Sequence, residues 1–299
     1  MKSDEIAVLA NPRAGRGRHR DLVSGVVRRL GAAGHPVRTL TAASSEEAEE
    51  ACQAAVAGGA AAVVAIGGDG TVHRVLQAVA GTTVPLGVVP AGTGNDFAAG
   101  TGVRGNLFEA AEAIGAALRD GSDHRIDLAR IERAGQSDRW FGAVLAAGID
   151  ALVNERANRM RWPRGPRRYD LAIALELVRP RPRVYELVLD DADHGFEGTL
   201  VAVGNCASYG GGMRILPDAD PADGLLDVVI AEPLGRAALV RLKPRMRRGT
   251  HVRDPRVTVF RARRVRLRSE GVVGYADGER VGPLAFEISC VPGAVRLLR

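Results

Sequence analysis

The stretch AIGGDGTVHRVLQAV, residues 65–79, joins an apolar run to a helix-like segment and decides the fold. Its first residues complete a short Ala, Val and Ile run that is typical of a buried strand. The residues after Thr71 repeat apolar side chains at helical spacing. Three glycines, Gly67, Gly68 and Gly70, surround the carboxylate of Asp69 at the junction. In an open α/β sheet, ligands bind at such junctions, beyond the carboxyl ends of the strands.

The rest of residues 1–125 repeats this alternation of short apolar runs and Ala-rich helical stretches. Such an alternation predicts an α/β domain with a doubly wound, mostly parallel sheet covered on both faces. We expect strands at residues 6–10, 37–42, 61–66 and 85–91, and helices at residues 20–33, 44–59, 72–80 and 106–121.

After residue 125 most apolar runs are strand-like, and helical candidates occur only near 166–179 and 234–248. This pattern predicts a second, β-rich domain over residues 126–299. Residues 1–125 are then a nucleotide-binding domain, and the last residues of the chain are candidates for a return to it.

Composition and cysteine usage narrow the class of protein. Of the 299 residues, 46% are hydrophobic and 25% are charged, which is ordinary for a globular chain. No apolar run approaches the ~18 residues of a membrane span, and the first apolar run is too short for a signal peptide. Three scattered cysteines, Cys52, Cys206 and Cys290, argue against a disulfide framework and a zinc site. We therefore expect a cytoplasmic protein.

Positive charge is concentrated in the second half of the chain. Residues 1–125 contain 12 Lys and Arg against 13 Asp and Glu, whereas residues 126–299 contain 29 against 22. The basic segments 158–170, 235–254 and 261–268 are either solvated Arg-rich faces or docking sites for an anionic membrane surface. Trp162 and Tyr169 favour the membrane interpretation. No nucleic-acid-binding motif accompanies the charge, so we expect no nucleic-acid partner.

Three loops at residues 11–18, 67–73 and 91–98 follow expected strands and are rich in glycine. Glycines there let backbone N–H groups approach phosphate oxygens, and the following helix N-termini favour negative charge. Asp69 and Asp96 suit a nucleotide accompanied by Mg²⁺. The alternative is a set of structural turns with Asp as helix caps, but three such loops favour phosphate binding. The G-x-x-x-x-G-K-[ST] and G-x-G-x-x-G motifs are absent.

The motifs NP-x-AG (11–15), GGDGT (67–71) and P-x-GTGNDFA (90–98) together resemble the bacterial diacylglycerol kinase-like lipid kinase family. This family is related to sphingosine and ceramide kinases and, distantly, to NAD kinases. GGDGT is shared with the NAD kinases, whereas GTGNDFA is more specific to the lipid kinases. The stretches at 209–230 and 275–280, the latter reading YADGER, extend the resemblance over nearly the whole chain.

The resemblance implies an α/β domain and a β-sandwich domain with the active site in the cleft between them. It also implies that Glu279 accepts the proton of the substrate hydroxyl, with Asp277 beside it. Asp223 would hold Mg²⁺, with the backbone carbonyls of Asp220 and Leu225 nearby. The residues assigned to ATP are Asn11, Pro12, Arg13, Ala14, Gly15, Thr41, Gly67, Gly68, Asp69, Gly70, Thr71, Val72, His73, Arg74, Thr93 and Asp96.

Two features of these assignments have alternatives. Asp277 and Glu279 would share one face of a regular strand, or the D-G pair forms a hairpin turn with a solvent-facing Glu. His73 and Arg74 stand where many family members have Asn-Glu, and a solvent-facing His73 is one interpretation. Arg16 and Arg18 are candidates for the cationic role near the phosphates.

We therefore predict an ATP- and Mg²⁺-dependent lipid kinase, a phosphotransferase whose favoured acceptor is diacylglycerol and whose product is then phosphatidic acid. One alternative is an NAD kinase-like enzyme with a soluble substrate. Another is a catalytically silent lipid- or nucleotide-binding regulator, supported only by His73 and Arg74. The acceptor lipid, the acyl specificity, the number of metal ions and the oligomeric state, a homodimer included, stay open.

Overall fold

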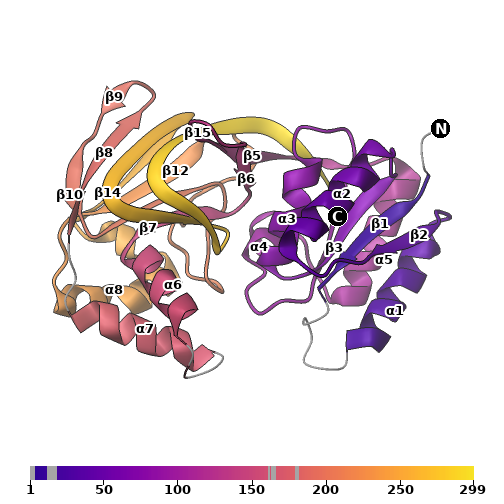
Figure 1. Cartoon of the computed structure of the whole chain (residues 1–299), viewed down its shortest axis with the longest axis horizontal. Helices are drawn as coiled ribbons and strands as arrows, with labels where there is room; N and C mark the ends of the chain where they lie inside the picture. The colour runs from indigo at the N-terminus through magenta and orange to yellow at the C-terminus, as the bar shows by residue number, and fades with distance from the viewer. Residues whose placement is uncertain (1–3, 12–18, 161, 163–165, 179–181) are drawn as a thin grey trace. The chain divides into compact units, whose positions relative to one another are not determined.

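The computed structural model describes residues 4–11, 19–160, 162, 166–178 and 182–299 (Figure 1). The chain forms two compact units. The first unit comprises Met1–Leu128, Pro221–Gly224 and Val291–Arg299, and the second comprises Ala129–Asp220 and Leu225–Cys290. Two late segments of the chain therefore belong to the first unit. A return of the last residues is among the expectations from the sequence, whereas the return of Pro221–Gly224 is not.

The first unit is built on a parallel sheet in the order β4–β3–β1–β2. The end of β15 adds a further parallel strand, because Leu297 and Leu298 pair with Leu86 and Gly87 of β4. This confirms the predicted mostly parallel sheet. The strands are β1 (Ile6–Ala10), β2 (Val37–Leu40), β3 (Ala62–Gly67), β4 (Leu86–Pro90) and β15 (Glu279–Leu298).

Two helices of the first unit begin at side-chain caps. The Ser44 hydroxyl accepts a hydrogen bond from the Glu47 amide at 3.1 Å, and Asn106 and Glu109 form a capping box. One face of the sheet buries Ile6, Val8 and Val64 with apolar residues of α1 and α5, while α2 contacts α3. The helices are α1 (His19–Gly31), α2 (Ser45–Ala57), α3 (Asp69–Val79), α4 (Asp96–Gly100) and α5 (Leu107–Asp120).

The second unit is β-rich, as predicted, and its strands pair antiparallel in the order β13–β12–β11–β7–β14–β15, with β8 also paired to β14. Its core is a continuous cluster that includes Phe141, Tyr185, Leu267 and Phe286. β5 begins in the first unit and ends in the second. The strands are β5 (His124–Glu132), β6 (Arg139–Phe141), β7 (Val144–Gly148), β8 (Arg183–Leu189), β9 (Ala192–Asp193), β10 (Phe196–Gly198), β11 (Leu200–Gly204), β12 (Leu226–Ala231), β13 (Val257–Ala262) and β14 (Arg264–Ala276).

Three α-helices also belong to the second unit. Two of them, α7 (Pro166–Val178) and α8 (Arg236–Arg248), lie at the expected helical segments, whereas α6 (Ile149–Arg159) is not expected from the sequence. Gly148, at φ 130°, directly precedes α6 and ends β7. A short 3₁₀ helix, His251–Arg253, follows α8. None of the described helices is long and apolar enough to cross a membrane.

Candidate functional site

The strand ends that the three predicted ligand loops follow lie at one edge of the first unit's sheet, because β1, β3 and β4 are parallel neighbours. The amide of Asn11 donates a hydrogen bond to the carbonyl of Ile66 at 3.1 Å, and the Ala91 amide donates to the Gly67 carbonyl at 2.8 Å. Thr41 directly follows β2 and is exposed at the same edge. Pro12, Arg13, Ala14, Gly15, Arg16 and Arg18 lie outside the described residues.

The second and third loops approach each other through their glycines. A Cβ atom placed on Gly92 would lie 2.4 Å from the Cα atom of Gly68 and 2.8 Å from Oδ1 of Asn95. A Cβ on Gly68 would lie 3.1 Å from the Cα of Gly92. A side chain at Gly92 would therefore force the two loops apart. The glycines allow this backbone contact between loops, which is a role that the sequence analysis does not assign to them.

The GTGND loop is braced by Asn95, which adopts a left-handed conformation with φ 58°. Its amide group accepts a hydrogen bond from the Gly92 amide at 2.9 Å and donates to the Gly92 carbonyl at 3.1 Å. Asp69 Oδ1 accepts a hydrogen bond from the Phe97 amide at 3.1 Å, at the start of α4. Asp96 is buried in the same turn. Asp69 therefore satisfies a donor of α4 rather than capping only its own helix.

The helix after the GGDGT motif begins at Asp69 and buries its first turns. Thr71 and Val72 are buried, and His73 is only 4% exposed. The interpretation that His73 faces solvent is therefore wrong. Gly70 lies in the first turn of α3, where the positive end of the helix favours an anion. Thr93 is exposed in the neighbouring loop.

Arg74 forms an ion pair with Glu49, from α3 to α2. The distance from Nη1 to Oε1 is 2.7 Å, and both side chains are mostly buried. A buried cation of this kind requires a counter-ion, since a charge without one is costly in the protein interior. Glu49 therefore neutralises the charge of Arg74, which stands where many family members have an acid. The ion pair also joins α3 to α2 on this face of the sheet.

Asp223, the predicted metal ligand, lies in the segment 221–224 of the first unit, whereas Asp220 and Leu225 belong to the second. The Asp223 side chain is exposed. Asp127, which is buried, fixes this segment: its Oδ2 accepts from the Gly224 amide at 2.7 Å. Its Oδ1 accepts from the Gly293 amide at 2.7 Å, and its own amide donates to the carbonyl of Pro221 at 2.8 Å. The sequence analysis missed Asp127, although a carboxylate inside the apolar run RIDLARIE was a usable signal.

Asp277 and Glu279 do not share one face of a strand, because the Asp277–Gly278 pair is the two-residue turn that joins β14 to β15. Both turn residues have positive φ, 51° and 83°, as the D-G alternative predicts. The Asp277 carboxylate accepts hydrogen bonds from the amides of Gly142 at 3.0 Å and Ala143 at 2.9 Å. Glu279 is half-buried at the start of β15. The turn is thus held by Asp277, and Glu279 is its neighbour on the next strand.

A polar network on α6 supports the same hairpin. Glu155 Oε1 accepts hydrogen bonds from the Tyr275 hydroxyl at 2.8 Å and from Nε of Arg280 at 2.6 Å. The Arg280 guanidinium holds the pKa of Glu155 below its usual value. Burial and the hydrogen bond to Glu155 raise the pKa of Tyr275. The residues on both sides of the turn are therefore tied to α6.

Asp150 in the first turn of α6 is the described carboxylate with the most strongly raised pKa. Burial raises its pKa to about 6, against hydrogen bonds that stabilise the charged form. Those bonds come from the Ala151 amide at 2.9 Å and from the Tyr209 hydroxyl at 3.1 Å. Tyr209 begins the glycine-rich stretch YGGGM, so Asp150 anchors that stretch to the start of α6.

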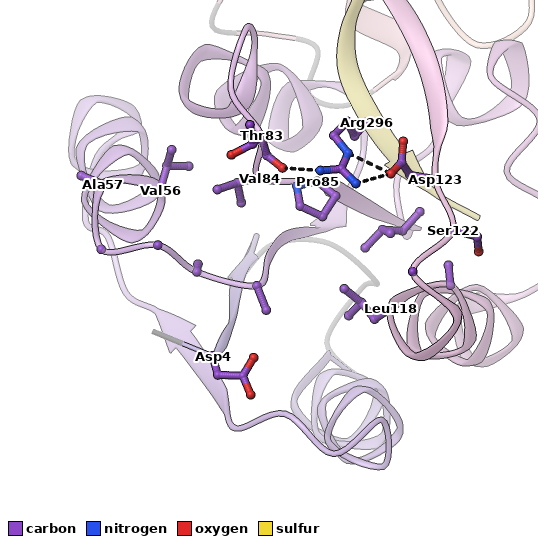
Figure 2. Close-up of a pocket in the computed structure, with 17 residues that line it drawn as sticks. Asp4, Val56, Ala57, Thr83, Val84, Pro85, Leu118, Ser122, Asp123 and Arg296 are labelled. Atoms are coloured by element: carbon purple, nitrogen blue, oxygen red, sulfur yellow. Dashed lines mark hydrogen bonds and ion pairs between the residues drawn. The ribbon is translucent and has the colours of Figure 1, made fainter. Parts of the chain in front are cut away.

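The first unit also contains a cavity of about 730 Å³, which Figure 2 shows. It is lined by residues that precede β1, β3 and β4, among them Asp4, Ala61 and Pro85, and it therefore lies at the opposite edge of the sheet from the ligand loops. Arg296 closes one side, where its Nε atom donates to Asp123 at 2.8 Å (Figure 2). None of the predicted site residues lines this cavity. This cavity is thus separate from the predicted site residues.

Within the described part of the chain, no group of three or more His, Cys, Asp or Glu side chains is arranged to hold a metal ion. Mg²⁺ in proteins often binds through one or two carboxylates and keeps several waters. The single exposed carboxylate of Asp223, on a segment fixed by Asp127, fits such a site. Asp220 lies three residues before Asp223 in the chain, and Leu225 lies two residues after it.

Comparison with known proteins finds a family match for each half of the chain. A sequence model of the family described as "Diacylglycerol kinase catalytic domain" matches residues 5–131. A second, described as "YegS C-terminal NAD kinase beta sandwich-like domain", matches residues 143–299. The two matches together cover both the α/β and the β-rich parts of the sequence.

Individual relatives agree with these matches. A protein named diacylglycerol kinase from Mycobacterium tuberculosis (strain ATCC 25618 / H37Rv) is 43% identical over 99% of this chain and 95% of its own length. A protein named probable lipid kinase YegS-like from Stenotrophomonas maltophilia is 32% identical over 79% of this chain and 77% of its own. The crystal structure of a putative diacylglycerol kinase from Bacillus anthracis superposes with a TM-score of 0.80 at 22% identity, covering 100% of this chain and 96% of that one. That likeness confirms the fold.

Proposed function

Because this chain belongs to the diacylglycerol kinase-like lipid kinase family, we propose that it transfers the γ-phosphate of ATP to a lipid hydroxyl, with diacylglycerol as the acceptor and phosphatidic acid as the product. That the chain is a kinase follows from the family, which also implies ATP as the phosphate donor. The single observation that carries the proposal is the convergence of Asn11, the GGDGT turn and the GTGND loop at one sheet edge.

The first unit binds the nucleotide in this proposal. The backbone N–H groups at the start of α3 lie at the positive end of the helix dipole, which favours the negative charge of a phosphate. Gly68 and Gly92 let the two loops come close enough for amides of both to surround one phosphate group. The predicted contacts of Asn11, Thr41, Thr71 and Thr93 would supply polar side chains around the same edge.

The second unit supplies the proton acceptor. The oxygen of the lipid hydroxyl forms a bond to the γ-phosphorus while the bond from that phosphorus to the bridging oxygen of ADP breaks. The hydroxyl proton passes to Glu279. Asp277 is less suited to this step, because each of its carboxylate oxygens already accepts a backbone hydrogen bond. Its role is to position the turn that carries Glu279.

Mg²⁺ is part of the proposal because kinases use it to neutralise charge on the transferred phosphoryl group. Asp223 is the residue that would hold a metal ion, and Asp69 and Asp96 are the carboxylates at the nucleotide edge. Asp127 keeps the backbone beside Asp223 in place through Gly224. These residues orient and bind, while Glu279 moves the proton.

The test is transfer of label from γ-labelled ATP into the organic phase, in mixed micelles of diacylglycerol, phosphatidylglycerol or sphingosine, with NAD in a separate reaction. Label in diacylglycerol supports the proposal. Label only in another lipid would overturn the acceptor, and label only in NADP would move the chain to a soluble substrate.

The variant Glu279→Gln tests the proton acceptor. Loss of a general base typically lowers turnover by about 10²–10⁴-fold, while ATP binding should stay unchanged. Glu270→Gln removes an exposed carboxylate from the same pair of long strands and is the matched control. Equal turnover of the two variants would refute the assignment of Glu279.

A further inference from the structure

Helix α8 (Arg236–Arg248) contains six cationic side chains and no acidic one. It packs on the second unit through Leu242, with Leu239 and Met246 against the same apolar cluster. The opposite face is open to solvent. Its exposed residues are Arg236, Ala237, Val240, Arg241, Lys243, Pro244, Arg247 and Arg248.

The exposed residues of α8 are ordered by chemistry around the helix. At 3.6 residues per turn, Ala237, Val240 and Pro244 form a stripe along the middle of the outward face. Arg236, Lys243 and Arg247 lie along one flank of the stripe, and Arg241 and Arg248 lie along the other. Val240 is 56% exposed although it is a large apolar residue. An apolar stripe between two rows of cations is typical of a helix that lies in a membrane interface.

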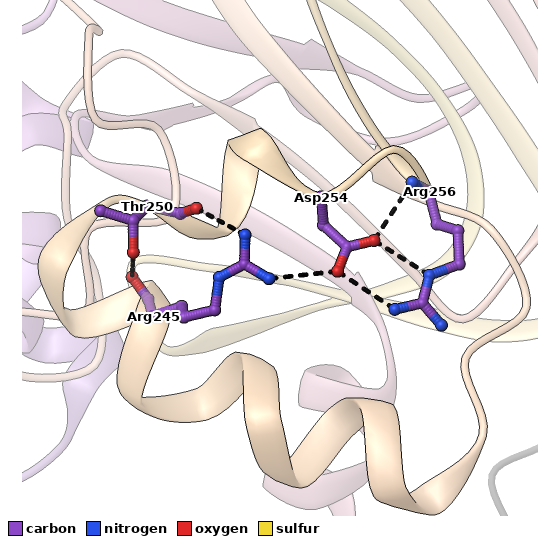
Figure 3. A network of polar contacts seen from close by, with 4 residues as sticks. All are labelled: Arg245, Thr250, Asp254 and Arg256. Carbon is purple, nitrogen blue, oxygen red and sulfur yellow. Dashed lines mark hydrogen bonds and ion pairs between the residues drawn. The ribbon is translucent and has the colours of Figure 1, made fainter.

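One cation of the helix is used internally. Arg245 donates to Asp254 at 3.2 Å and to the carbonyl of Thr250 at 3.0 Å, and Arg256 pairs with the same carboxylate at 2.9 Å (Figure 3). These cations hold the pKa of Asp254 at about 2. This network fixes the C-terminal end of α8 to the following turn.

Four other cations of α8 have no carboxylate within ion-pair distance among the described residues: Arg241, Lys243, Arg247 and Arg248. The basic segment 261–268 on β13 and β14 is different. There Arg261 lies 3.9 Å from Asp227, Arg264 lies 3.1 Å from Asp191, and Arg266 lies 3.4 Å from Glu287. Three of the five arginines in that segment are therefore paired with carboxylates, whereas the four outward cations of α8 are not.

The neighbouring helix and the residues before it also expose large apolar side chains. α7 contacts α8, and Figure 1 shows the two helices side by side. Leu175 of α7 is exposed, as is Trp162 just before it. Trp is enriched at the headgroup level of membranes because its ring is amphipathic.

We propose that the outward face of α8 docks on an anionic lipid bilayer, with Val240 and its apolar neighbours in the headgroup region and the flanking cations against lipid phosphates. The inference rests on the proposed function, since a lipid acceptor stays in a membrane. Charge alone would also suit a nucleic acid, but the exposed apolar stripe between the cations favours a bilayer.

The experiment is co-sedimentation of the full chain, without ATP, with vesicles of phosphatidylglycerol and phosphatidylcholine or of phosphatidylcholine alone. We expect binding to the anionic vesicles that weakens as salt is added. The triple variant K243Q/R247Q/R248Q should bind about a hundredfold less, at roughly fivefold per cation. R261Q/R264Q/R266Q removes the same net charge from arginines that are paired with carboxylates and should bind nearly as well as the wild type.

A second pair of variants tests the apolar stripe. Val240→Glu should lower vesicle binding by about tenfold or more, while Val184→Glu, at a valine that is 71% exposed on β8, should not. Equal losses in the two triple variants, or unchanged binding of Val240→Glu, would overturn the proposal. If the α8 triple variant loses binding to duplex DNA but keeps its binding to anionic vesicles, the proposal is also overturned.

Activity on a dispersed short-chain diacylglycerol separates this proposal from the proposed function. The α8 variants should keep that activity, because the acceptor no longer has to be reached in a bilayer. If they keep it and lose vesicle binding, the docking proposal is supported. If vesicle binding behaves as expected but no protein phosphorylates any lipid, the proposed function fails while α8 remains the docking surface.

Discussion

Gly92→Ala tests whether the contact between the GGDGT turn and the GTGND loop is needed for nucleotide binding. The added Cβ would lie 2.4 Å from the Cα of Gly68, and ordinary contact begins near 3.4 Å. The backbone must therefore open by about 1 Å, because the obstructing atom is a main-chain carbon and has no other rotamer. Asn95 cannot relieve the strain, since its Oδ1 would lie 2.8 Å from the new methyl group.

Two effects of this opening can be measured separately. Overpacking of this kind costs about 1–3 kcal/mol of the free energy of unfolding. A 1 Å displacement of positioning groups can lower a rate by about a hundredfold. We therefore expect a modest loss in urea denaturation and a much larger loss in ATP binding and in phosphate transfer.

The matched control is Gly31→Ala at the end of α1. There the added Cβ meets only the Val37 side chain, at 3.7 Å, which is ordinary contact. This variant should gain about 0.5–1 kcal/mol from the lower entropy of the unfolded chain and should bind ATP normally. If Gly92→Ala binds ATP as tightly as Gly31→Ala does, the idea that this loop contact builds the nucleotide site is refuted.

Three further predictions concern buried charges. In Asp127→Asn, one of the two glycine amides faces an NH₂ group instead of an oxygen. The free energy of unfolding, measured in urea, should therefore fall by about 2 kcal/mol, and the Mg²⁺ concentration for half-maximal activity should rise. An unchanged Mg²⁺ dependence would separate Asp127 from the metal site. Arg74→Met leaves Glu49 without its counter-ion and should cost about 3 kcal/mol, whereas the double variant with Glu49→Leu should recover most of that loss in the same assay; no recovery would mean that the pair is not the source. The pKa of Asp150 is raised from 3.8 to about 6, so between these pH values the native state binds a proton that the unfolded state has lost. The contribution of Asp150 to the free energy of unfolding therefore falls as pH rises from about 4 to 6, by up to about 3 kcal/mol. Thermal unfolding of Asp150→Asn should lack this fall, and a pH dependence identical to that of the wild type would contradict the assignment.

Much of the first unit follows from sequence patterns because its elements are short and periodic, and two of its helices begin at side-chain caps. The strand–helix alternation is confirmed, and the cap at Ser44 marks α2 correctly. The helix after the GGDGT motif begins at Asp69 instead of residue 72, because the low helix propensity of Gly70 hides the first turn. The return of Pro221–Gly224 and Val291–Arg299 to the first unit has no local signature. It depends on long-range contacts such as those of Asp127.

In the candidate site, too, sequence patterns predict local turns but not contacts between distant residues. Local turn chemistry identifies the Asp277–Gly278 hairpin, and it is a better guide there than strand periodicity, which places Asp277 and Glu279 on one face. The partner of Arg74 is 25 residues away in the chain, so no spacing rule connects the two. The structure supplies such pairs because the packing of α2 against α3 determines which side chains meet.

The sequence and the structure together explain why a carboxylate, Asp69, stands inside the GGDGT turn. Asp69 begins α3, where the helix dipole stabilises a negative charge, and it accepts a hydrogen bond from Phe97 of the neighbouring loop. The protein thus holds an anion at the edge where a nucleotide is expected to bind. Since a lone anion there would repel phosphates, the arrangement favours a nucleotide that arrives with a divalent cation. We therefore expect the carboxylate that joins the two loops to favour the metal-bound form of the nucleotide, in accord with the proposed Mg²⁺ dependence.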